Sequence, residues 1–256
     1  MIKTIKRTLR SASHRLGYDI VPWWPDKTAG YPADFDAEAI ELCNFVKGYT
    51  VTSPERLMAL RDAVDYVLRF EIPGDFVECG VWRGGSMMAV ARTLTARGAA
   101  NRHLHLFDTF EGMSEPTNAD VDFHGSSASA LLNSAEKSSS IWVYSPLEDV
   151  ERNIKLTNYP SNLVHFVKGK VEDTIPANAP DQIALLRLDT DFYESTYHEL
   201  VHLFPRLSPG GVLIIDDYGH WQGARQAVDQ YFSENMLRPF LHRVDYTARV
   251  VVKSGR

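Results

Sequence analysis

Short apolar runs alternate with amphipathic segments along most of the chain. The runs that are short enough for buried strands lie at 76–79, 103–107, 163–167, 183–188 and 212–215. The segments between them carry apolar residues at helical spacing, at about 85–98, 146–157, 193–206 and 222–233. Strands that alternate with helices predict a parallel sheet covered on both faces, so we expect an α/β fold.

The segments on either side of this alternation complete the predicted architecture. Ser53 is placed to cap a helix that has Pro54 at its first position. After the last helix, Leu241–Val244 and Arg249–Val252 are joined by only a few residues. A parallel crossover needs about a dozen residues, so this pair is expected to be antiparallel. We therefore predict a doubly wound, Rossmann-like sheet that is mostly parallel and ends in a C-terminal antiparallel hairpin.

Two stretches break the pattern. Residues 17–35 are rich in Pro, Trp and Gly, which is typical of an irregular arm. We expect residues 1–45 to form an N-terminal arm or helix that serves as a lid or an oligomer contact, and residues 46–256 to form the main domain. The low-complexity stretch at 126–140 is typical of a mobile loop or lid.

Composition excludes several classes of protein. The chain of 256 residues is 44% hydrophobic and 23% charged, as expected of a globular domain with a sizeable core. A formal net charge of −6 argues against a nucleic-acid partner. No apolar run reaches the roughly 18 residues of a membrane span, so we expect no integral membrane segment. Cys43 and Cys79 form no disulfide framework, which favours a cytoplasmic protein.

A glycine-rich turn, ECGVWRGGS at residues 78–86, follows the first strand. Glycines in such a turn let the backbone approach a ligand closely, and the amides that begin the next helix favour an anion such as a carboxylate. The spacing is GxxxGG and not the GxGxxG of dinucleotide-binding proteins. The negative charge of Glu78 suits an ammonium or sulfonium group. A tight turn without a ligand gives the same pattern. The candidate ligand contacts here are Glu78, Gly80, Trp82, Gly84 and Ser86.

Two later strand ends supply further candidate contacts. Asp108 ends the second run and is followed by Thr109. An acid at this place typically accepts hydrogen bonds from a ribose diol, in a nicotinamide dinucleotide or in S-adenosylmethionine alike. The turn that holds Gly169 and Val171 is expected to border the adenine, although a plain loop is an equal alternative. These residues predict an adenosine-containing ligand.

Four carboxylates, those of Asp189, Asp191, Asp216 and Asp217, follow the fourth and fifth runs. Parallel strands end at the same edge of a sheet, so we expect these acids to lie close together. Clustered like charges are costly unless a cation pairs with them, and oxygen ligands suit Mg²⁺. Asp is also common in turns, but this number of acids favours a metal site. His220 follows the last pair and is a candidate general base or a loop histidine.

Four motifs give the chain a family resemblance. They are FVECGVWRGGS at 76–86, LFDTFEGM at 106–113, LLRLDTDFYEST at 185–196 and IIDDYGHWQGARQAVDQYF at 214–232. With these motifs in matching order and spacing, residues from about 45 to 252 resemble the macrocin O-methyltransferase family, which acts on deoxysugars of macrolides and related natural products. The resemblance implies a class I methyltransferase fold, S-adenosylmethionine as the methyl donor, and Mg²⁺.

The resemblance also implies roles for individual residues. The residues implied to hold the methionine end of the donor are Glu78, Gly80 and Ser86. Asp108 is implied to bind the ribose of the donor. The residues implied to bind the metal, as in the catechol methyltransferases, are Asp189, Asp216 and Asp217.

The general base is not identified by the resemblance. Where a catechol enzyme has a lysine three residues after its first metal aspartate, this chain has Phe192. The catalytic candidates are Asp189 and Asp191, with His220 behind them. A carboxylate near the acceptor hydroxyl would take its proton.

The resulting prediction is an S-adenosylmethionine-dependent, Mg²⁺-assisted O-methyltransferase that acts on a sugar hydroxyl of a glycosylated small molecule or glycan. One alternative is a catechol or phenol acceptor. Alternatives from other classes are an NAD-dependent dehydrogenase, against which the missing GxGxxG argues, and an inactive nucleoside-binding module, against which the intact acidic set argues. The resemblance and the unmatched arm also lead us to expect a homo-oligomer.

Overall fold

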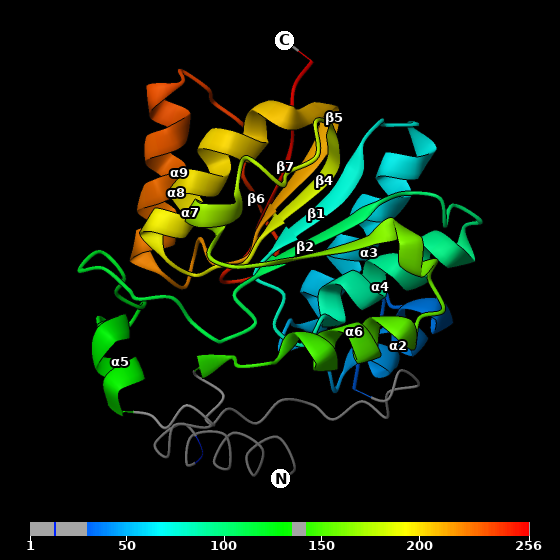
Figure 1. Ribbon diagram of the computed structural model, residues 1–256, viewed down its shortest axis with the longest axis horizontal. Helices are drawn as coiled ribbons and strands as arrows, with labels where there is room; N and C mark the ends of the chain where they lie inside the picture. Colours follow the sequence, from blue (N-terminus) through cyan, green and yellow to red (C-terminus); the bar gives the residue numbers. More distant parts are fainter. Residues whose placement is uncertain (1–12, 14–29, 135–141, 256) are drawn as a thin grey trace, which may run out of the picture. The chain divides into compact units, whose positions relative to one another are not determined.

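The computed structural model describes residues 13, 30–134 and 142–255 (Figure 1). The chain forms two compact units, residues 1–40 and 41–256. In the first unit the rings of Tyr31 and Phe35 stack with their centroids 6.0 Å apart. Most of the predicted arm lies outside the described residues, so its role as a lid or oligomer contact stays a prediction.

The strands and most helices follow one another as the alternation of the sequence predicts, and the helices at 37–46, 128–134 and 171–174 are additional to it. In chain order the elements are α2 (Ala37–Val46), α3 (Pro54–Arg69), β1 (Asp75–Cys79), α4 (Gly85–Ala96), β2 (Leu104–Asp108), α5 (Ala128–Ser134), α6 (Leu147–Lys155), η2 (Ser161–Leu163), β3 (Val164–Lys168), α7 (Val171–Thr174), β4 (Ile183–Leu188), α8 (Tyr193–Leu203), η3 (Phe204–Arg206), β5 (Leu207–Ile215), α9 (Gln222–Glu234), β6 (His242–Arg243) and β7 (Arg249–Val252).

The strands form one seven-stranded sheet in the order β3-β2-β1-β4-β5-β7-β6. The first five strands in this order pair in parallel. β7 pairs antiparallel with β5, and β6 pairs antiparallel with β7. The predicted doubly wound sheet with a C-terminal antiparallel hairpin is therefore confirmed. The strand order changes direction at β1, with β2 on one side and β4 on the other, which is where α/β sheets bind ligands.

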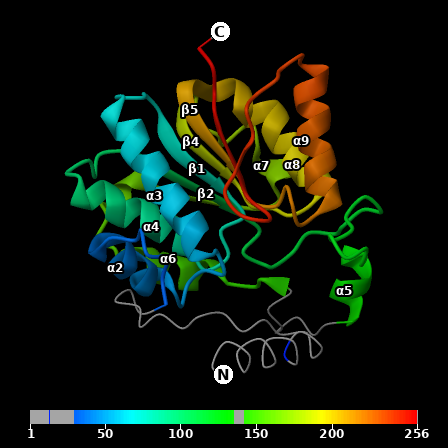
Figure 2. The ribbon, with the colours of Figure 1, turned by 180° about the vertical axis from the view of Figure 1, so that it is seen from behind.

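Helices cover both faces of the sheet, so its central strands are buried on both sides. Figures 1 and 2 show α3, α4 and α6 against one face and α7, α8 and α9 against the other. Every residue of β4 is buried, as its continuous apolar run predicts. Leu186 and Leu213 of β4 and β5 pack in a core with Val228 of α9. This core fixes where the strands end, and hence where the loops that follow them lie.

The predicted start of α3 is confirmed. The Ser53 hydroxyl accepts a hydrogen bond from the Arg56 amide at 3.3 Å, which satisfies one of the free N–H groups of the first turn. Pro54 occupies the first helical position, where its missing N–H costs nothing. The capped turn places the Arg56 side chain beside the ends of the strands.

Two segments differ from their sequence-based expectation. β5 begins at Leu207, before the predicted run at 212–215, because the Ser-Pro-Gly-Gly stretch is held in the sheet. Leu207 pairs with Ile183 across a register shift, and Gly210 donates its N–H to the Lys253 carbonyl at 2.8 Å. Residues 128–134 of the predicted loop form α5, which buries Ala128 and Leu132 against Phe192. In both places tertiary pairing overrides local preference.

Among the described residues, no helix is both long and apolar enough to cross a membrane.

Candidate active site

A cavity of about 400 Å³ lies at the carboxyl ends of the parallel strands. Its walls come from the segment before α3 and from the turns that follow β1 to β5. The residues proposed from the sequence that line it are Gly80, Trp82, Ser86, Asp108, Thr109, Gly169, Val171, Asp189, Asp191, Asp216, Asp217 and His220. Glu78 and Gly84 do not line it. The volume is in the range of pockets for small molecules and cofactors.

Gly80 is where the turn after β1 meets the turn after β4. Its φ of +81° is in the left-handed region, and a Cβ at this position would lie 2.0 Å from the Asp189 carbonyl oxygen. The two turns are joined further by the Asp189 N–H, which donates to the Cys79 carbonyl at 2.8 Å. The glycine is thus required by the close approach of the protein's own backbone.

Glu78 and Gly84 have structural surroundings that the sequence does not reveal. Glu78 is 1% exposed, and its Oε1 accepts from Arg187 at 2.8 Å. Burial raises the pKa of Glu78 to about 7, against the lowering effect of Arg187. Gly84 precedes α4 with a φ of +87°, and a Cβ there would meet Val150 and Ile154 of α6. Gly84 therefore serves the packing of two helices.

Asp108 organises the turns after β1 and β2. Its Oδ2 accepts from the amides of Val81 at 2.6 Å and Trp82 at 3.0 Å. Its Oδ1 accepts from the Phe110 amide at 2.6 Å. Burial raises the pKa of Asp108, and these N–H donors oppose that rise by favouring the carboxylate. The carboxylate thus shapes the cavity wall at the place where the sequence predicts a ribose contact.

The turn after β3 closes the same side of the cavity. Gly169 has a φ of +142°, and its N–H donates to the Asp108 carbonyl at 3.0 Å. A Cβ on Gly169 would lie 2.8 Å from the Thr174 side chain, so the turn is tight. Val171 begins α7 and is 5% exposed. The predicted adenine-bordering residues are therefore placed beside Asp108.

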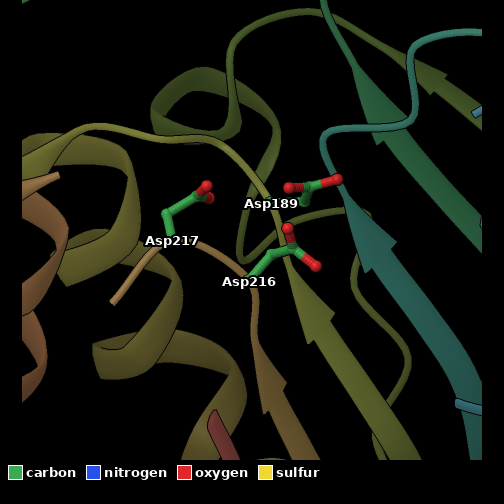
Figure 3. A group of neighbouring side chains, drawn as sticks. All are labelled: Asp189, Asp216 and Asp217. Atoms are coloured by element: carbon green, nitrogen blue, oxygen red, sulfur yellow. The ribbon is translucent and has the colours of Figure 1, made fainter. Parts of the chain in front are cut away.

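The side chains of three of the predicted acids lie close together and point toward one another (Figure 3). Asp189 follows β4, and Asp216 and Asp217 follow β5. Each offers one carboxylate oxygen within 4.8 Å of those of the other two, which is a spacing that suits one shared cation. Asp216 and Asp217 are buried, whereas the Asp189 side chain is 29% exposed.

Among the four predicted acids, Asp191 and Asp217 have no guanidinium partner in the described part of the chain. Burial and then the neighbouring carboxylates of Asp191 and Asp189 raise the pKa of Asp217 well above its usual range. Asp191 adopts a φ of +67°, donates its N–H to Asp217 at 3.2 Å and accepts from Trp221 Nε1 at 2.7 Å. Burial raises the pKa of Asp191 to about 6.

Arg187 is a site residue that the sequence-based reasoning missed. Its side chain is 3% exposed and contacts the carboxylates of Glu78, Asp189 and Asp216 at 2.8, 2.6 and 2.5 Å. Its Nη2 also donates to the Thr52 hydroxyl at 3.2 Å. The available signal was a charged residue in the middle of an otherwise apolar strand, because a buried charge needs a partner. Arg187 links the acid of β1 to the acids after β4 and β5.

Arg56 is a second cation that the sequence-based reasoning missed. Its Nη1 contacts Asp216 Oδ2, and its Nε lies 3.2 Å from Asp245 Oδ2. The Arg56 side chain is 16% exposed and lines the cavity. No local pattern reveals this contact, because Arg56 and Asp216 are 160 positions apart in the sequence.

His220 lies at the cavity wall among aromatic side chains. Its Nδ1 is 3.1 Å from the Tyr246 hydroxyl, and its ring centroid is 5.1 Å from that of Phe123. Burial lowers the pKa of His220 below its usual value, which favours the neutral imidazole. Phe123 and Tyr246 are each 50% exposed, so aromatic surface is exposed beside His220.

Comparison with known proteins gives consistent relatives. The profile of the family described as Macrocin-O-methyltransferase (TylF) matches residues 36–253. The 8-demethyl-8-(2,3-dimethoxy-alpha-L-rhamnosyl)-tetracenomycin-C 4'-O-methyltransferase of Streptomyces olivaceus is 38% identical, over 78% of this chain and 73% of that protein. The mycinamicin III 3''-O-methyltransferase of Micromonospora griseorubida is 34% identical, over 77% of this chain and 75% of that protein. The solved structure of the O-methyltransferase NovP has a TM-score of 0.70 at 29% identity, covering 90% of this chain and 86% of that one.

Proposed function

The chain belongs to the macrocin O-methyltransferase family, and from this premise we propose that it methylates a sugar hydroxyl of a glycosylated small molecule, with S-adenosylmethionine as donor and Mg²⁺ bound. Membership of an O-methyltransferase family excludes the alternative of an NAD-dependent dehydrogenase. The proposal of a sugar acceptor is supported by the tetracenomycin relative, whose name gives a rhamnosyl group on the molecule that it methylates.

The acidic cluster fits a divalent metal ion. Asp189, Asp216 and Asp217 together supply hard oxygen donors, which Mg²⁺ prefers. Asp217 is 8% exposed with a pKa well above its usual range, so a nearby cation would favour its ionised form. A divalent ion held by these oxygens lowers the pKa of a coordinated hydroxyl and fixes its direction.

The part of the cavity lining that follows β1, β2 and β3 fits the donor. We assign Asp108 and Thr109 to the ribose, and Gly169 and Val171 to the adenine, because all four line the cavity. Ser86 is at the start of α4 and is 5% exposed, so it lies where helix amides favour a carboxylate. The donor supplies an electrophilic methyl group. The chain's own contribution is to hold donor and acceptor in line, and such alignment is worth about 7–11 kcal/mol of a reaction barrier.

The acceptor proton requires a base at the cavity. The candidates proposed from the sequence, namely Asp189, Asp191 and His220, all line the cavity. Burial raises the pKa of Asp189 well above its usual range, and the contact with Arg187 opposes that rise by favouring the ionised carboxylate. Substituting each candidate in turn by Asn, and measuring kcat against pH, separates them. The base is the residue whose loss removes the acidic limb of the profile.

The observation that carries the proposal is the arrangement of one cavity. The glycine turn, Asp108 and the three neighbouring aspartates all line this one cavity. Donor contacts and a metal site in one space suit a group transfer to an oxygen that the metal orients.

The proposal is tested by calorimetric titration of the protein with S-adenosylmethionine, with and without Mg²⁺. We expect micromolar binding in both conditions, because the donor and metal residues are separate. Absence of binding in both conditions would refute the assignment of the donor. Donor binding without any turnover would instead support an inactive binding module.

A panel of acceptors tests the second half of the proposal. Glycosides with vicinal sugar hydroxyls are compared with catechols and simple phenols, and products are read by mass spectrometry. We expect methylated glycosides, a loss of product with EDTA, and recovery with added Mg²⁺. Methylation of phenols alone would favour the phenol acceptor.

A further inference from the structure

The two oxygens of Asp216 are contacted by different arginines. Oδ1 accepts from Arg187 Nη2 at 2.5 Å, and Oδ2 is contacted by Arg56 Nη1. Asp216 is thus paired with two cations, whereas Asp217 beside it is paired with none of the arginines or lysines in the described ranges. The positive charge around the acidic cluster is unevenly shared.

The two arginines differ in how firmly they are held. Arg187 is 3% exposed, lies within the central strand β4 and is also bound to Glu78 and Asp189. Arg56 is 16% exposed, projects from the first turn of α3 and lines the cavity. Arg187 is therefore a fixed part of the sheet, and Arg56 reaches the cluster from the cavity side.

Arg56 has a second carboxylate partner outside the cluster. Its Nε lies 3.2 Å from Asp245 Oδ2. Asp245 is itself fixed, because its Oδ1 accepts from the amides of Thr247 at 3.0 Å and Ala248 at 2.8 Å. If Arg56 leaves Asp216, it retains a charged partner that does not have to move.

A divalent ion and the Arg56 guanidinium would compete for the same carboxylate. Two positive groups a few ångströms apart repel strongly in a site shielded from water. Arg187 cannot withdraw without leaving Glu78 and Asp189 unpaired, so Arg56 is the group with freedom to withdraw. Its withdrawal would leave Asp216 Oδ2 available to a metal.

We propose that Arg56 is a displaceable internal cation, which neutralises Asp216 when no metal is bound and moves onto Asp245 alone when a divalent ion enters. This inference rests on the proposed metal-dependent function. It assigns Arg56 a positioning role that lowers metal affinity and keeps the empty cluster stable.

The test is calorimetric titration with Mn²⁺, in the absence of donor, of the wild type and the Arg56→Met variant. Met keeps much of the stem of the side chain and removes the guanidinium. We expect the Kd for Mn²⁺ to fall by about tenfold or more, as is typical of coupled binding sites. Arg56→Gln provides a second variant, and circular dichroism confirms that both fold.

Lys170→Met is the matched control. Lys170 also lines the cavity but makes no ion pair within the described residues, so its loss reports the general effect of removing a positive charge. We expect its Kd for Mn²⁺ to change by less than about twofold, because screening weakens distant charges. An equal gain in affinity for the Lys170 and Arg56 variants would overturn the proposal.

A crystal structure with Mn²⁺, located by its anomalous signal, gives the direct readout. The expected result is an Arg56 guanidinium that contacts Asp245 and no longer Asp216. Mn²⁺ and Arg56 bound together on Asp216, or a weaker affinity in Arg56→Met, would overturn the displacement. Failure of the wild type and every variant to bind Mn²⁺ would refute the metal part of the proposed function as well, so the two failures are distinguishable.

Discussion

The two walls of the cavity hold their acids by different means. The donor half, formed by the turns 80–86, 108–112 and 169–171, holds Asp108 with backbone N–H groups. The metal half, formed by 189–191 and 216–217, holds Asp189 and Asp216 with guanidinium groups that come from β4 and α3. Backbone donors are neutral and local, whereas the guanidinium groups bring charge from elsewhere in the fold.

This difference shows how each half responds to its ligand. N–H groups favour the ionised form of a buried carboxylate against the rise in pKa that burial causes, and they shape a wall without a counter-ion. Carboxylates held by arginines share their charge with cations that a metal must join or displace. The donor half is therefore prepared by its turn sequence, and the metal half by an internal balance of charge, which Arg187 extends to Glu78.

The largest expected effect is on the free energy of unfolding, and it comes from removing Arg187, which links Glu78 of β1 to the acids of the metal half. Arg187→Met leaves the buried carboxylates of Glu78 and Asp216 without this partner, so we expect the free energy of unfolding to fall by about 3–5 kcal/mol. Urea denaturation measures the loss. Arg97→Met is the control, because its pair with Asp65 is about one third exposed and is expected to contribute at most about 1 kcal/mol. Similar losses in both variants would contradict the role of Arg187.

The second effect separates the metal half from the donor half. Asp217→Asn removes a carboxylate that we propose as a metal ligand, so we expect kcat for methyl transfer to fall by about 100-fold or more, which corresponds to at least about 2.7 kcal/mol of barrier. Donor affinity, measured by calorimetry, is expected to stay within about twofold of wild type because Asp217 belongs to the proposed metal cluster and not to the proposed donor contacts. Asp149→Asn on α6 is an exposed control. A collapse of donor affinity in Asp217→Asn would show that the two halves are not separate.

The third effect is a loss of donor affinity with unchanged metal affinity. Asp108→Asn loses the negative charge that accepts from Val81, Trp82 and Phe110, so the turns after β1 and β2 relax. Charged hydrogen bonds of this kind are worth about 1.5–3 kcal/mol, so we expect donor affinity to fall by about tenfold or more. Calorimetry with Mn²⁺ should show unchanged metal affinity. A parallel loss of metal affinity would argue against two independently held walls.

The last effect, which is smallest near pH 4, concerns an acid that is held by neither the backbone N–H groups nor the guanidinium groups described above. Glu199 is fully buried and accepts from the Thr190 hydroxyl at 3.0 Å, and burial raises its pKa well above the usual value. The folded state therefore keeps a proton on Glu199 that the unfolded state releases above about pH 4.3. Between that pH and the raised pKa of the folded state, the contribution of Glu199 to the free energy of unfolding falls as pH rises, by at most about 1.4 kcal/mol per pH unit.

Glu199→Gln removes this titration and keeps the shape of the side chain. We expect wild type and variant to agree within about 0.5 kcal/mol near pH 4, and the variant to become relatively more stable towards pH 8. Denaturation at several pH values measures the gap. A gap that narrows with rising pH would mean that the folded protein ionises Glu199 and pairs it with a cation.

The sequence predicted the fold well because the decisive signals are local. Apolar runs at 76–79 and 183–188 are short and lie between helical patterns, which favours buried strands, and the short connection before Arg249–Val252 indicated an antiparallel pair, which the pairing of β6 with β7 confirms. The start of α5 at Ala128 was missed because its serine-rich sequence favours a loop and its helix depends on packing against Phe192. Local preference is weak where burial decides.

The candidate site was predicted in part. The rule that ligands bind beyond the strand ends brought Asp108, Asp189 and Asp216 into one cavity. Gly84 was grouped with these residues because it belongs to the glycine turn, yet it lies away from the cavity and against α6. A turn motif gives the positions of its glycines but not which of them face a ligand and which face a neighbouring helix.

By itself, the sequence determined the order of strands and helices, the family, and the acids that end each strand, because each of these depends on spacing along the chain. Only the tertiary structure decided how those acids are neutralised. Arg56 and Asp216 are 160 positions apart, and Arg187 and Glu78 are 109 positions apart. Pairing across such separations is set by how the sheet and helices pack, and no local pattern of residues records it.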